Sequence, residues 1–288
     1  MDRRHFIKRS MAAGMLALSP FPHHLYAGTQ RKYISDVVKL GNTGISLSRL
    51  AIGTGSNGWN RSSNQTRKLG IKGLADMLYA GTDLGVVFWD SADMYGSHPH
   101  LKEALKRVPR EKVVILTKTL ASTEQEMKDD LDRFRKEIGV DYIDIMLLHN
   151  MQKKNWPEIK AGAMNILSQA REDGIIKAHG VSCHTIEALK TAADTDWVQV
   201  DMARINYEGV IMDAKVPVVV DVLKKMKASG KAIIRMKILG NGQLSNNVDE
   251  CLQFVLAQDY VDCFSIGVEN YDQLKDLEKR TPEASVRG

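Results

Sequence analysis

The amino-acid sequence predicts an α/β fold, a closed (β/α)8 TIM barrel preceded by an N-terminal β-hairpin. From residue 28 onward, short apolar runs alternate with longer amphipathic segments, and eight of these runs have the length and composition of strands. Such alternation produces parallel βαβ units. Eight units within roughly 240 residues fit a closed barrel better than an open sheet.

The expected strands are short segments rich in Val, Ile and Leu. They cover residues 48–55, 86–90, 112–118, 142–149, 175–182, 197–206, 232–239 and 262–267. After the third, Met127, Leu131, Phe134 and Ile138 recur at spacings of three and four, which indicates one face of a helix, and Gly139 stands where glycine commonly ends a helix. Ahead of the first strand, two strand-like runs flank residues 41–44 (GNTG), a sequence typical of a hairpin turn.

The first 27 residues have the layout of an export signal. Arg3, Arg4, Lys8 and Arg9 precede a short apolar stretch, and the run RRHFIK resembles the twin-arginine signal. We expect cleavage after Ala27, export by the twin-arginine machinery to the periplasm or another site outside the cytoplasm, and one barrel domain at residues 28–288. The stretch is too short for a stable membrane-spanning helix, and no cysteine lies near the junction to carry a lipid, so no stable membrane anchor is expected. The alternative is a disordered basic tail.

Charge and cysteine content exclude several classes of partner. The formal net charge is +5, of which residues 1–27 contribute +3, so no concentrated basic stripe remains and nucleic acid is not an expected partner. Cys183, Cys251 and Cys263 form an odd set without CxxC spacing. This pattern predicts neither a disulfide framework nor a structural zinc site.

Four polar residues follow or end the expected strands where chemistry is normally found in such barrels. The active site of a (β/α)8 barrel lies at the carboxyl ends of its strands. The second strand ends at Asp90 and runs on to Tyr95, the third ends at Lys118 and the fourth at His149. Because unpaired buried charge is costly, this convergence indicates a functional site.

The chemistry of the four groups is coherent. A phenol with a pKa of about 10 is a poor acid or base at neutral pH, and a neighbouring lysine cation favours the phenolate. The aspartate would hold that lysine in place and charged. The histidine could orient a carbonyl oxygen or relay a proton. Proton transfer to a carbonyl fits this set, but none of these side chains supplies hydride, so a redox cofactor is required.

The sequence resembles the aldo-keto reductases over essentially its whole length after residue 35. The residues that carry the resemblance are KLGNTGISLSRLAIGTG, WDSADMYG, ILTK, DYIDIMLLH and GVS, in that order. The resemblance implies that Asp90, Tyr95, Lys118 and His149 form the catalytic tetrad, with Tyr95 as the general acid in reduction. It also implies a cofactor, NADP or NAD, and a small-molecule carbonyl or sugar-like substrate, with no metal.

The same resemblance implies a set of cofactor contacts, of which several depart from the family pattern. They are Gly53, Thr54, Ser182, Cys183, Asn206, Lys237, Leu239, Gly240, Glu269 and Gln273. Ser182-Cys183 replaces the usual Ser-Asn, and Met236 and Lys237 stand where the family often stacks an aromatic ring on the nicotinamide. Lys237 and the following LGNG could cradle the pyrophosphate, although a plain helix-entry turn explains that glycine-rich run equally well.

Two departures near the C-terminus affect specificity. Val268, Glu269 and Gln273 stand where the family typically supplies Lys or Arg to the 2′-phosphate of NADP. A carboxylate there would repel the phosphate and accept hydrogen bonds from a ribose diol, so we expect a weakened NADP preference and use of NAD. The chain also stops about twenty residues after the last strand, which predicts an open pocket with low discrimination among small substrates.

Two other functions compete with this interpretation. His98 and His100 form an H-x-H pair, with His149, His179 and His184 at or near strand ends, which would suit a metal-dependent hydrolase. That pair lies well past its strand, where we expect it to cap the next helix or line a loop. The second alternative is an exported, non-catalytic or sensing barrel with a vestigial site. We expect Asp93 to face solvent or cap the following helix.

Overall fold

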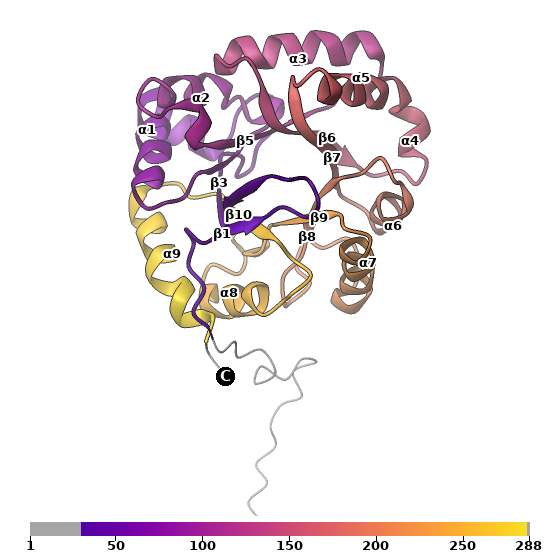
Figure 1. Ribbon diagram of the computed structural model, residues 1–288. Coiled ribbons are helices and arrows are strands. Elements are labelled where there is room, and N and C mark those ends of the chain that lie inside the picture. The colour runs from indigo at the N-terminus through magenta and orange to yellow at the C-terminus, as the bar shows by residue number, and fades with distance from the viewer. Residues whose placement is uncertain (1–29, 287–288) are drawn as a thin grey trace, which may run out of the picture.

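Eight parallel strands close into a barrel in the order β10-β3-β4-β5-β6-β7-β8-β9, with helices around the outside (Figure 1). The computed structural model describes residues 30–286, so the export signal predicted for residues 1–27 lies outside the described residues. The predicted closed barrel is confirmed, and each strand falls within or overlaps a predicted segment. The strands are β3 (Leu50–Gly53), β4 (Phe88–Asp90), β5 (Val114–Thr119), β6 (Ile143–Met151), β7 (Ile176–Cys183), β8 (Val200–Arg204), β9 (Ala232–Met236) and β10 (Cys263–Ile266).

Helices connect successive strands and cover the outer face of the barrel. They are α1 (Asn64–Asp83), α2 (His98–Ala104), α3 (Glu124–Ile138), α4 (Trp156–Ile159), α5 (Ala161–Glu172), α6 (Ile186–Asp194), α7 (Val216–Ala228), α8 (Val248–Leu256) and α9 (Tyr271–Ala284). The described part of the chain also contains the 3₁₀ turns η2 (Asp93–Tyr95), η3 (Arg110–Lys112) and η4 (Gly240–Gly242). No helix within residues 30–286 is both long and apolar enough to cross a membrane.

Helix α3 shows how local sequence sets an element's bounds. Thr123 and Glu126 form a reciprocal capping box at its start, which satisfies backbone N–H groups that the helix leaves free. Gly139 ends the helix in the left-handed conformation that glycine adopts without steric cost. The predicted apolar face, Met127 to Ile138, is buried against the barrel.

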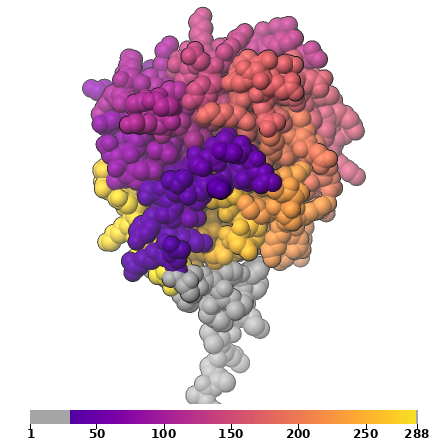
Figure 2. Space-filling model, viewed as in Figure 1, coloured from indigo at the N-terminus to yellow at the C-terminus, as the bar shows by residue number. Residues whose placement is uncertain are grey.

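The predicted hairpin closes one end of the barrel. Strands β1 (Val37–Lys39) and β2 (Ser46–Ser48) pair antiparallel, and Leu40, Ile45 and Leu47 pack with the side chains of the barrel interior. Figures 1 and 2 show this segment, in indigo, lying across the barrel end that faces the viewer. The amino ends of the strands are thereby sealed, and the opposite end remains for function.

One outward-facing residue on β8 is an exception to the apolar packing between strands and helices. Val200 and Met202 point into the barrel, so the alternation of a strand turns Asp201 outward. Its side chain is fully buried, and burial, the largest cause, raises its pKa to about 7, against a smaller lowering effect of the neighbouring Cys183 thiol. The folded protein therefore holds the proton on Asp201 more tightly than the unfolded chain does.

We predict that Asp201→Asn stabilises the protein at high pH but not at low pH. Because the folded-state pKa lies above the unfolded value, the stability of the natural protein falls as pH rises from about 4 to about 7. Asparagine does not titrate, so the gain in unfolding free energy should be near zero at pH 4 and up to about 4 kcal/mol at pH 8. Urea denaturation at both pH values measures it, with the exposed Asp221→Asn on α7 as the control. Equal effects at both pH values would contradict the prediction.

Candidate active site

The period-two alternation of neighbouring strands brings three ionisable side chains to the open end of the barrel. Phe88, Leu116 and Leu147 lie in the barrel interior. Two residues further along the same strands come Asp90 on β4, Lys118 on β5 and His149 on β6. Because every second residue of a strand shares a face, all three point into the barrel above its apolar core.

Lys118 is held by a buried ion pair. Its side chain is fully buried, and its Nζ pairs with Oδ1 of Asp90 and donates to the backbone carbonyl of Ser91 at 2.8 Å. The second oxygen of Asp90, Oδ2, accepts a hydrogen bond from Ser265 Oγ on β10 at 2.6 Å. The carboxylate therefore links β4 to both β5 and β10.

Tyr95 reaches the same place from a loop rather than from a strand. It ends the 3₁₀ turn η2, and its ring lies edge-on to His149, with the centroids 5.7 Å apart, and 4.8 Å from Lys118 Nζ. The loop after β3 packs so tightly on the ring that a Cβ on Gly55 or Gly58 would come within 2.2–2.3 Å of ring carbons. Both positions therefore require glycine. The structure brings together all four predicted catalytic residues, Asp90, Tyr95, Lys118 and His149.

The electrostatics of the phenol differ from the sequence-based expectation. Burial, the largest cause, raises the pKa of Tyr95; Lys118 lowers it and Asp90 raises it further, so the net shift is upward. The expected bias toward phenolate therefore does not prevail, because desolvation and Asp90 together outweigh the lysine. A phenol that keeps its proton at neutral pH is suited to donate it.

Lys118 and His149 have pKa values shifted in directions that fix their charge. The pKa of Lys118 is raised because Asp90 and Tyr95 outweigh its desolvation, so the ammonium keeps its charge. The pKa of His149 lies well below the ordinary value, first because of burial and then because of Lys118, His184 and Lys237. The imidazole is therefore neutral at physiological pH and can donate one N–H to a ligand.

A cavity of about 550 Å³ opens beside Tyr95 and Asp90. Half of the predicted cofactor contacts line it: Gly53, Lys237, Leu239, Glu269 and Gln273. The cavity extends from the barrel mouth, where Met202 and Met236 lie, along the loop after β9 to the start of α9. It is therefore bordered by the loops in which the sequence placed the cofactor.

The remaining predicted contacts lie near the cavity without lining it. Thr54 donates to the carbonyl of Asp90, Ser182 Oγ accepts from the backbone of Asn150, and Cys183 is buried toward Asp201. Asn206 ties down two loops by donating to the carbonyls of Val210 and Lys237, and Gly240 begins η4. In this geometry they shape the backbone around the cavity.

Glu269, predicted to repel a 2′-phosphate, is itself paired with residues of α1. Its carboxylate pairs with Lys68 and accepts a hydrogen bond from Asn64 Nδ2 at 2.6 Å, both from α1. The Lys68 contact is the largest cause of its lowered pKa, so the group is ionised and partly neutralised. Sequence reasoning missed both partners, because α1 is far from residue 269 in the chain.

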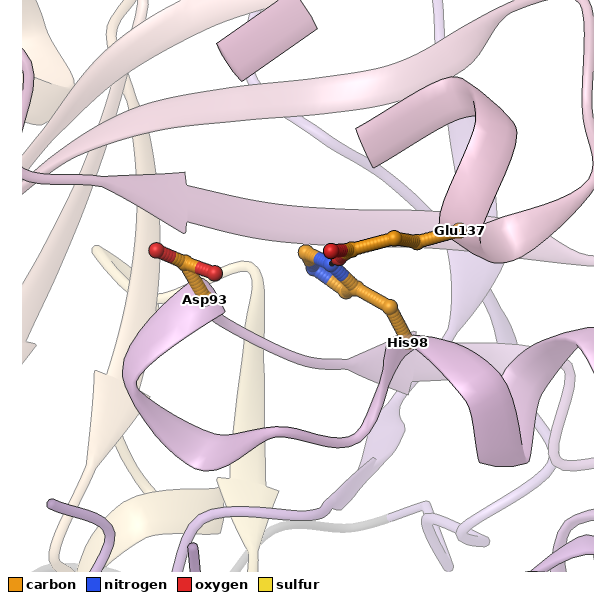
Figure 3. Close-up of side chains that lie close together, drawn as sticks. All are labelled: Asp93, His98 and Glu137. Carbon is orange, nitrogen blue, oxygen red and sulfur yellow. Dashed lines mark hydrogen bonds and ion pairs between the residues drawn. The ribbon is translucent and has the colours of Figure 1, made fainter. Parts of the chain in front are cut away.

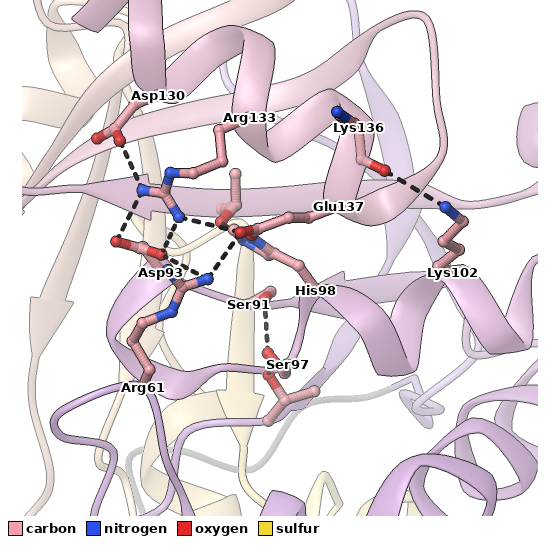
Figure 4. Close-up of polar contacts among 12 residues, drawn as sticks. Arg61, Ser91, Asp93, Ser97, His98, Lys102, Asp130, Arg133, Lys136 and Glu137 are labelled. Carbon is pink, nitrogen blue, oxygen red and sulfur yellow. Dashed lines mark hydrogen bonds and ion pairs between the residues drawn. The ribbon is translucent and has the colours of Figure 1, made fainter. Parts of the chain in front are cut away.

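Asp93 and His98 differ from their predicted placements. Asp93 begins η2, but it neither caps a helix nor projects freely into solvent, because Arg133 on α3 donates to both of its oxygens (Figure 4). His98, the first residue of α2, is buried and bonded through both ring nitrogens, to Glu137 at 2.8 Å and to Thr117 at 2.7 Å. Hydrogen bonds to residues far away in the chain therefore fix the side chains of both Asp93 and His98.

The histidines do not assemble as a metal-dependent hydrolase would require. His179 stacks on Trp197, whereas His149 lies against Tyr95 and His184 lies against His149. Between residues 30 and 286, the one group with metal-ligand spacing is Asp93, His98 and Glu137 (Figure 3), which contains a single histidine of the five considered.

Several cavity-lining or supporting residues were not predicted, among them Ser265, Asn64, Ser56 and Asn241. Ser265 could have been found from its strand, because Cys263 faces the interior and residue 265 must share that face. The other three lie in loops or at a helix start, where no periodic signal marks orientation.

The chain resembles known oxidoreductases in sequence. An aldo-keto reductase, str7, of Strobilurus tenacellus is 28% identical over 59% of this chain and 51% of its own length. Glycerol 2-dehydrogenase (NADP(+)) of Saccharomyces cerevisiae is 29% identical over 40% of this chain and 32% of its own, and D-threo-aldose 1-dehydrogenase of a Pseudomonas species 22% over 59% and 61%. The matched regions span less than two thirds of each of these relatives.

Solved structures share the fold. A Pseudomonas aeruginosa protein described as an aldo-keto reductase superposes with a TM-score of 0.70 at 24% identity, covering 88% of this chain and 97% of that one. A holo-form aldo-keto reductase of Bacillus halodurans gives 0.68 at 16% identity, covering 85% and 90%. The sequence profile of the Aldo/keto reductase family matches residues 49–279. The chain belongs to the aldo/keto reductase family.

Proposed function

We propose that this protein is a nicotinamide-dependent oxidoreductase that interconverts a small carbonyl compound and its alcohol, with Tyr95 as the general acid and base. The observation that carries the proposal is the buried Asp90–Lys118 pair beside Tyr95 at the mouth of the cavity. A buried lysine is costly, and here its one charged partner is itself bonded on both oxygens. Keeping a cation buried next to a phenol costs desolvation free energy, and we infer that this cation assists proton transfer by the phenol.

The cavity fits an elongated, anionic cofactor. Lys237 lines it with its pKa lowered, chiefly by burial, and its backbone adopts the left-handed conformation (φ 55°) that turns the chain into η4. Lys237 would bind the pyrophosphate together with the loop of Leu239 and Gly240, and Glu269 and Gln273 would bind the far ribose. When bound, the nicotinamide supplies or accepts hydride at the substrate carbon.

The residues of the chain account for the proton. In reduction, a neutral His149 donates a hydrogen bond to the substrate carbonyl and orients it. Tyr95 then donates its Oη proton to the oxygen as negative charge develops there, and Lys118 stabilises the resulting phenolate. Asp90 keeps Lys118 charged and fixed. In oxidation, the phenolate of Tyr95 accepts the alcohol proton.

The substrate we propose is a small carbonyl compound or sugar-like polyol. Two relatives are named for dehydrogenation of glycerol and of an aldose. In this chain Met202 and Met236 line the same cavity as Tyr95. Thioether side chains are flexible and adapt to varied ligands, which favours acceptance of several small substrates.

We predict that Tyr95→Phe lowers kcat by about 10²- to 10⁴-fold, because the proton donor is lost while the cavity is preserved. Glyceraldehyde reduction with NADH and NADPH measures turnover, and quenching of protein fluorescence measures coenzyme binding, which should stay within about twofold. Because the Tyr95 pKa is raised, reduction should be flat through neutral pH and decline only in alkali, and oxidation should rise with pH.

The matched control is Tyr79→Phe on α1, whose ring stacks with Arg107. It should leave turnover unchanged. Full activity in Tyr95→Phe, or a loss of coenzyme binding that accounts for the whole effect, would overturn the role proposed for the phenol. A natural protein that binds coenzyme but turns over no carbonyl compound would favour a non-catalytic barrel.

We further propose that NADP is not strongly preferred over NAD. A 2′-phosphate would approach the ionised Glu269 and the side chain of Asp276, whereas a ribose diol could donate to Glu269. Lys68 and Arg280 already pair with these two carboxylates. Among the described residues, Lys237 on the loop after β9 is the one lysine or arginine that lines the cavity. Arg67 on α1 also lowers the pKa of Glu269 but does not line the cavity.

The expected result is comparable dissociation constants for NAD and NADP, determined by fluorescence titration. Glu269→Gln should tighten NADP binding about tenfold, because a repulsive charge is removed, and should weaken NAD binding. Glu278→Gln, farther along α9, is the control. If the natural protein bound NADP far more tightly and Glu269→Gln changed nothing, Lys68 would be the phosphate ligand instead.

We also propose that the twin-arginine pathway exports this protein in a folded state with coenzyme bound. The support is the pair Arg3-Arg4 before Phe6, Ile7 and Lys8. Free nicotinamide coenzyme is scarce outside the cytoplasm, so one bound molecule would have to be recycled between an oxidisable and a reducible substrate.

Replacing Arg3 and Arg4 together by lysine should retain the folded enzyme in the cytoplasm of a bacterium that has this pathway. Cell fractionation and immunoblotting locate the protein, and the exported natural protein should show nicotinamide absorbance after gel filtration. Arg31→Lys, beyond the predicted cleavage point, is the control. Unchanged export of the double variant would refute the pathway, and exported protein without coenzyme would refute export in the loaded state.

A further inference from the structure

We propose that Arg133 is a positioning residue, which from outside the barrel fixes the position of Tyr95 relative to Lys118. It acts through a set of side chains that we call the α3 network: Arg61, Asp93, His98, Thr117, Thr119, Asp130, Arg133 and Glu137. Figure 4 labels all of them except Thr117 and Thr119. The inference rests on the proposed role of Tyr95 as the proton donor and deepens it.

Arg133 forms hydrogen bonds to the turn that carries Tyr95. From the outer part of α3, its guanidinium donates to Asp93 Oδ1 at 2.7 Å and to Oδ2 at 3.0 Å. This two-point contact fixes direction as well as distance. Asp93 begins the three-residue turn η2, and Tyr95 ends it. Arg133 therefore fixes the backbone two residues before the phenol.

A second arm of the network reaches the strand that carries Lys118. Arg133 also donates to Asp130 Oδ1 at 2.6 Å, and Asp130 Oδ2 accepts from the Thr119 hydroxyl. Because Lys118 points into the barrel, the alternation of β5 turns Thr119 outward, toward α3. The same arginine thereby contacts the Tyr95 turn directly and the Lys118 strand through one carboxylate.

A third arm meets β5 on the other side of Lys118. Arg133 donates to Glu137 Oε1 at 3.2 Å, and Glu137 Oε2 bonds to His98, which in turn bonds to the Thr117 hydroxyl. Thr117 and Thr119 are the two neighbours of Lys118 in the chain. The network therefore holds β5 at both residues that flank the lysine.

The loop that covers the Tyr95 ring joins the same network. Arg61 donates to Glu137 at 2.7 Å and lies 3.6 Å from Asp93. Its carbonyl oxygen lies 2.0 Å from where a Cβ on Gly96 would be, so the loop and the turn are in close contact. Gly55 and Gly58, earlier in this loop, press on the phenol ring. The ring is thus confined between elements that the network ties together.

Charge explains why the arrangement depends on Arg133. Asp93, Asp130 and Glu137 converge on it, and their side chains are only 19–23% exposed, so water screens their mutual repulsion poorly. Without Arg133, Asp130 loses the one cation with which it pairs among the described residues, and the carboxylates repel one another. Displacement of the turn by about 1 Å is enough to lower a catalytic rate by about 10²-fold.

A bound cation is the competing interpretation of part of this cluster. Ligand atoms of Asp93, His98 and Glu137 lie within 4.8 Å of one another (Figure 3). However, both ring nitrogens of His98 are already bonded, and the carboxylates are bonded to Arg133 and Arg61. A metal ion would face two guanidinium groups at close range, which the arrangement disfavours.

The test compares Arg133→Met with Arg135→Met in the full-length protein. Arg135 lies on the same helix and pairs with Asp132, away from the Tyr95 turn. We expect Arg133→Met to lower kcat about 10²-fold, with KM and the coenzyme dissociation constant within about twofold, and Arg135→Met to change none of them. Arg133→Lys, which keeps the charge but not the two-point contact, should restore part of kcat.

A spectroscopic readout makes the test independent of turnover. In protein labelled at the tyrosine ζ carbon, the resonance absent from Tyr95→Phe identifies Tyr95. It should shift in Arg133→Met but not in Arg135→Met, because its distance from Lys118 changes. Should Arg133→Met not fold by circular dichroism, Asp93→Asn provides the same comparison and should give the same two effects.

The outcomes separate the two proposals. An unchanged Tyr95 resonance and unchanged kcat in folded Arg133→Met would overturn the positioning role. An inactive natural protein would overturn the proposed function alone, since the resonance still reports the position of the phenol. The purified protein could instead contain one equivalent of metal. If chelation removed that metal and also shifted the Tyr95 resonance, a metal ion rather than Arg133 would explain the position of the phenol.

Discussion

The buried pair of Asp90 and Lys118 is the interaction on which the rest of the site depends. Lys118 is fully buried in the barrel mouth, and a lone ammonium there would cost several kcal/mol in desolvation. Asp90, the Ser91 carbonyl and, behind Asp90, the Ser265 hydroxyl offset this cost. These contacts tie β4 to β5 and β10, so the position of the charge and the register of three strands are set together.

That charge also determines how its two neighbours can act. It contributes to the low pKa of His149, so the imidazole is neutral and would meet a ligand as a hydrogen-bond donor. It lowers the pKa of Tyr95 but is outweighed by burial and by Asp90. The lysine therefore leaves the phenol protonated and reduces the cost of the phenolate once the proton has left. Both effects favour donation over abstraction at neutral pH.

The sequence predicted the features that depend on periodicity and on short-range order. The eight strands, the apolar face of α3, its end at Gly139 and the hairpin follow from patterns a few residues long. The convergence of Asp90, Lys118 and His149 follows from strand alternation. What could not be predicted is pairing between distant elements, such as Asp93 with Arg133 or Glu269 with Lys68. The sequence around a charged residue on a helix or turn does not indicate which distant residue it will pair with, because the packing of the helices on the barrel determines that partner.

This limit bears on where the determinants of the site lie. In a parallel strand, the residues on either side of an inward-facing group must face outward, toward the helices. Thr117 and Thr119 therefore connect the strand that carries Lys118 to α3 through hydrogen bonds, although neither threonine borders the cavity. The same geometry applies wherever a barrel strand ends in a functional residue. The helical layer thus does more than cover apolar strands: its polar side chains can set the position of a reacting group whose own contacts are all inside the barrel.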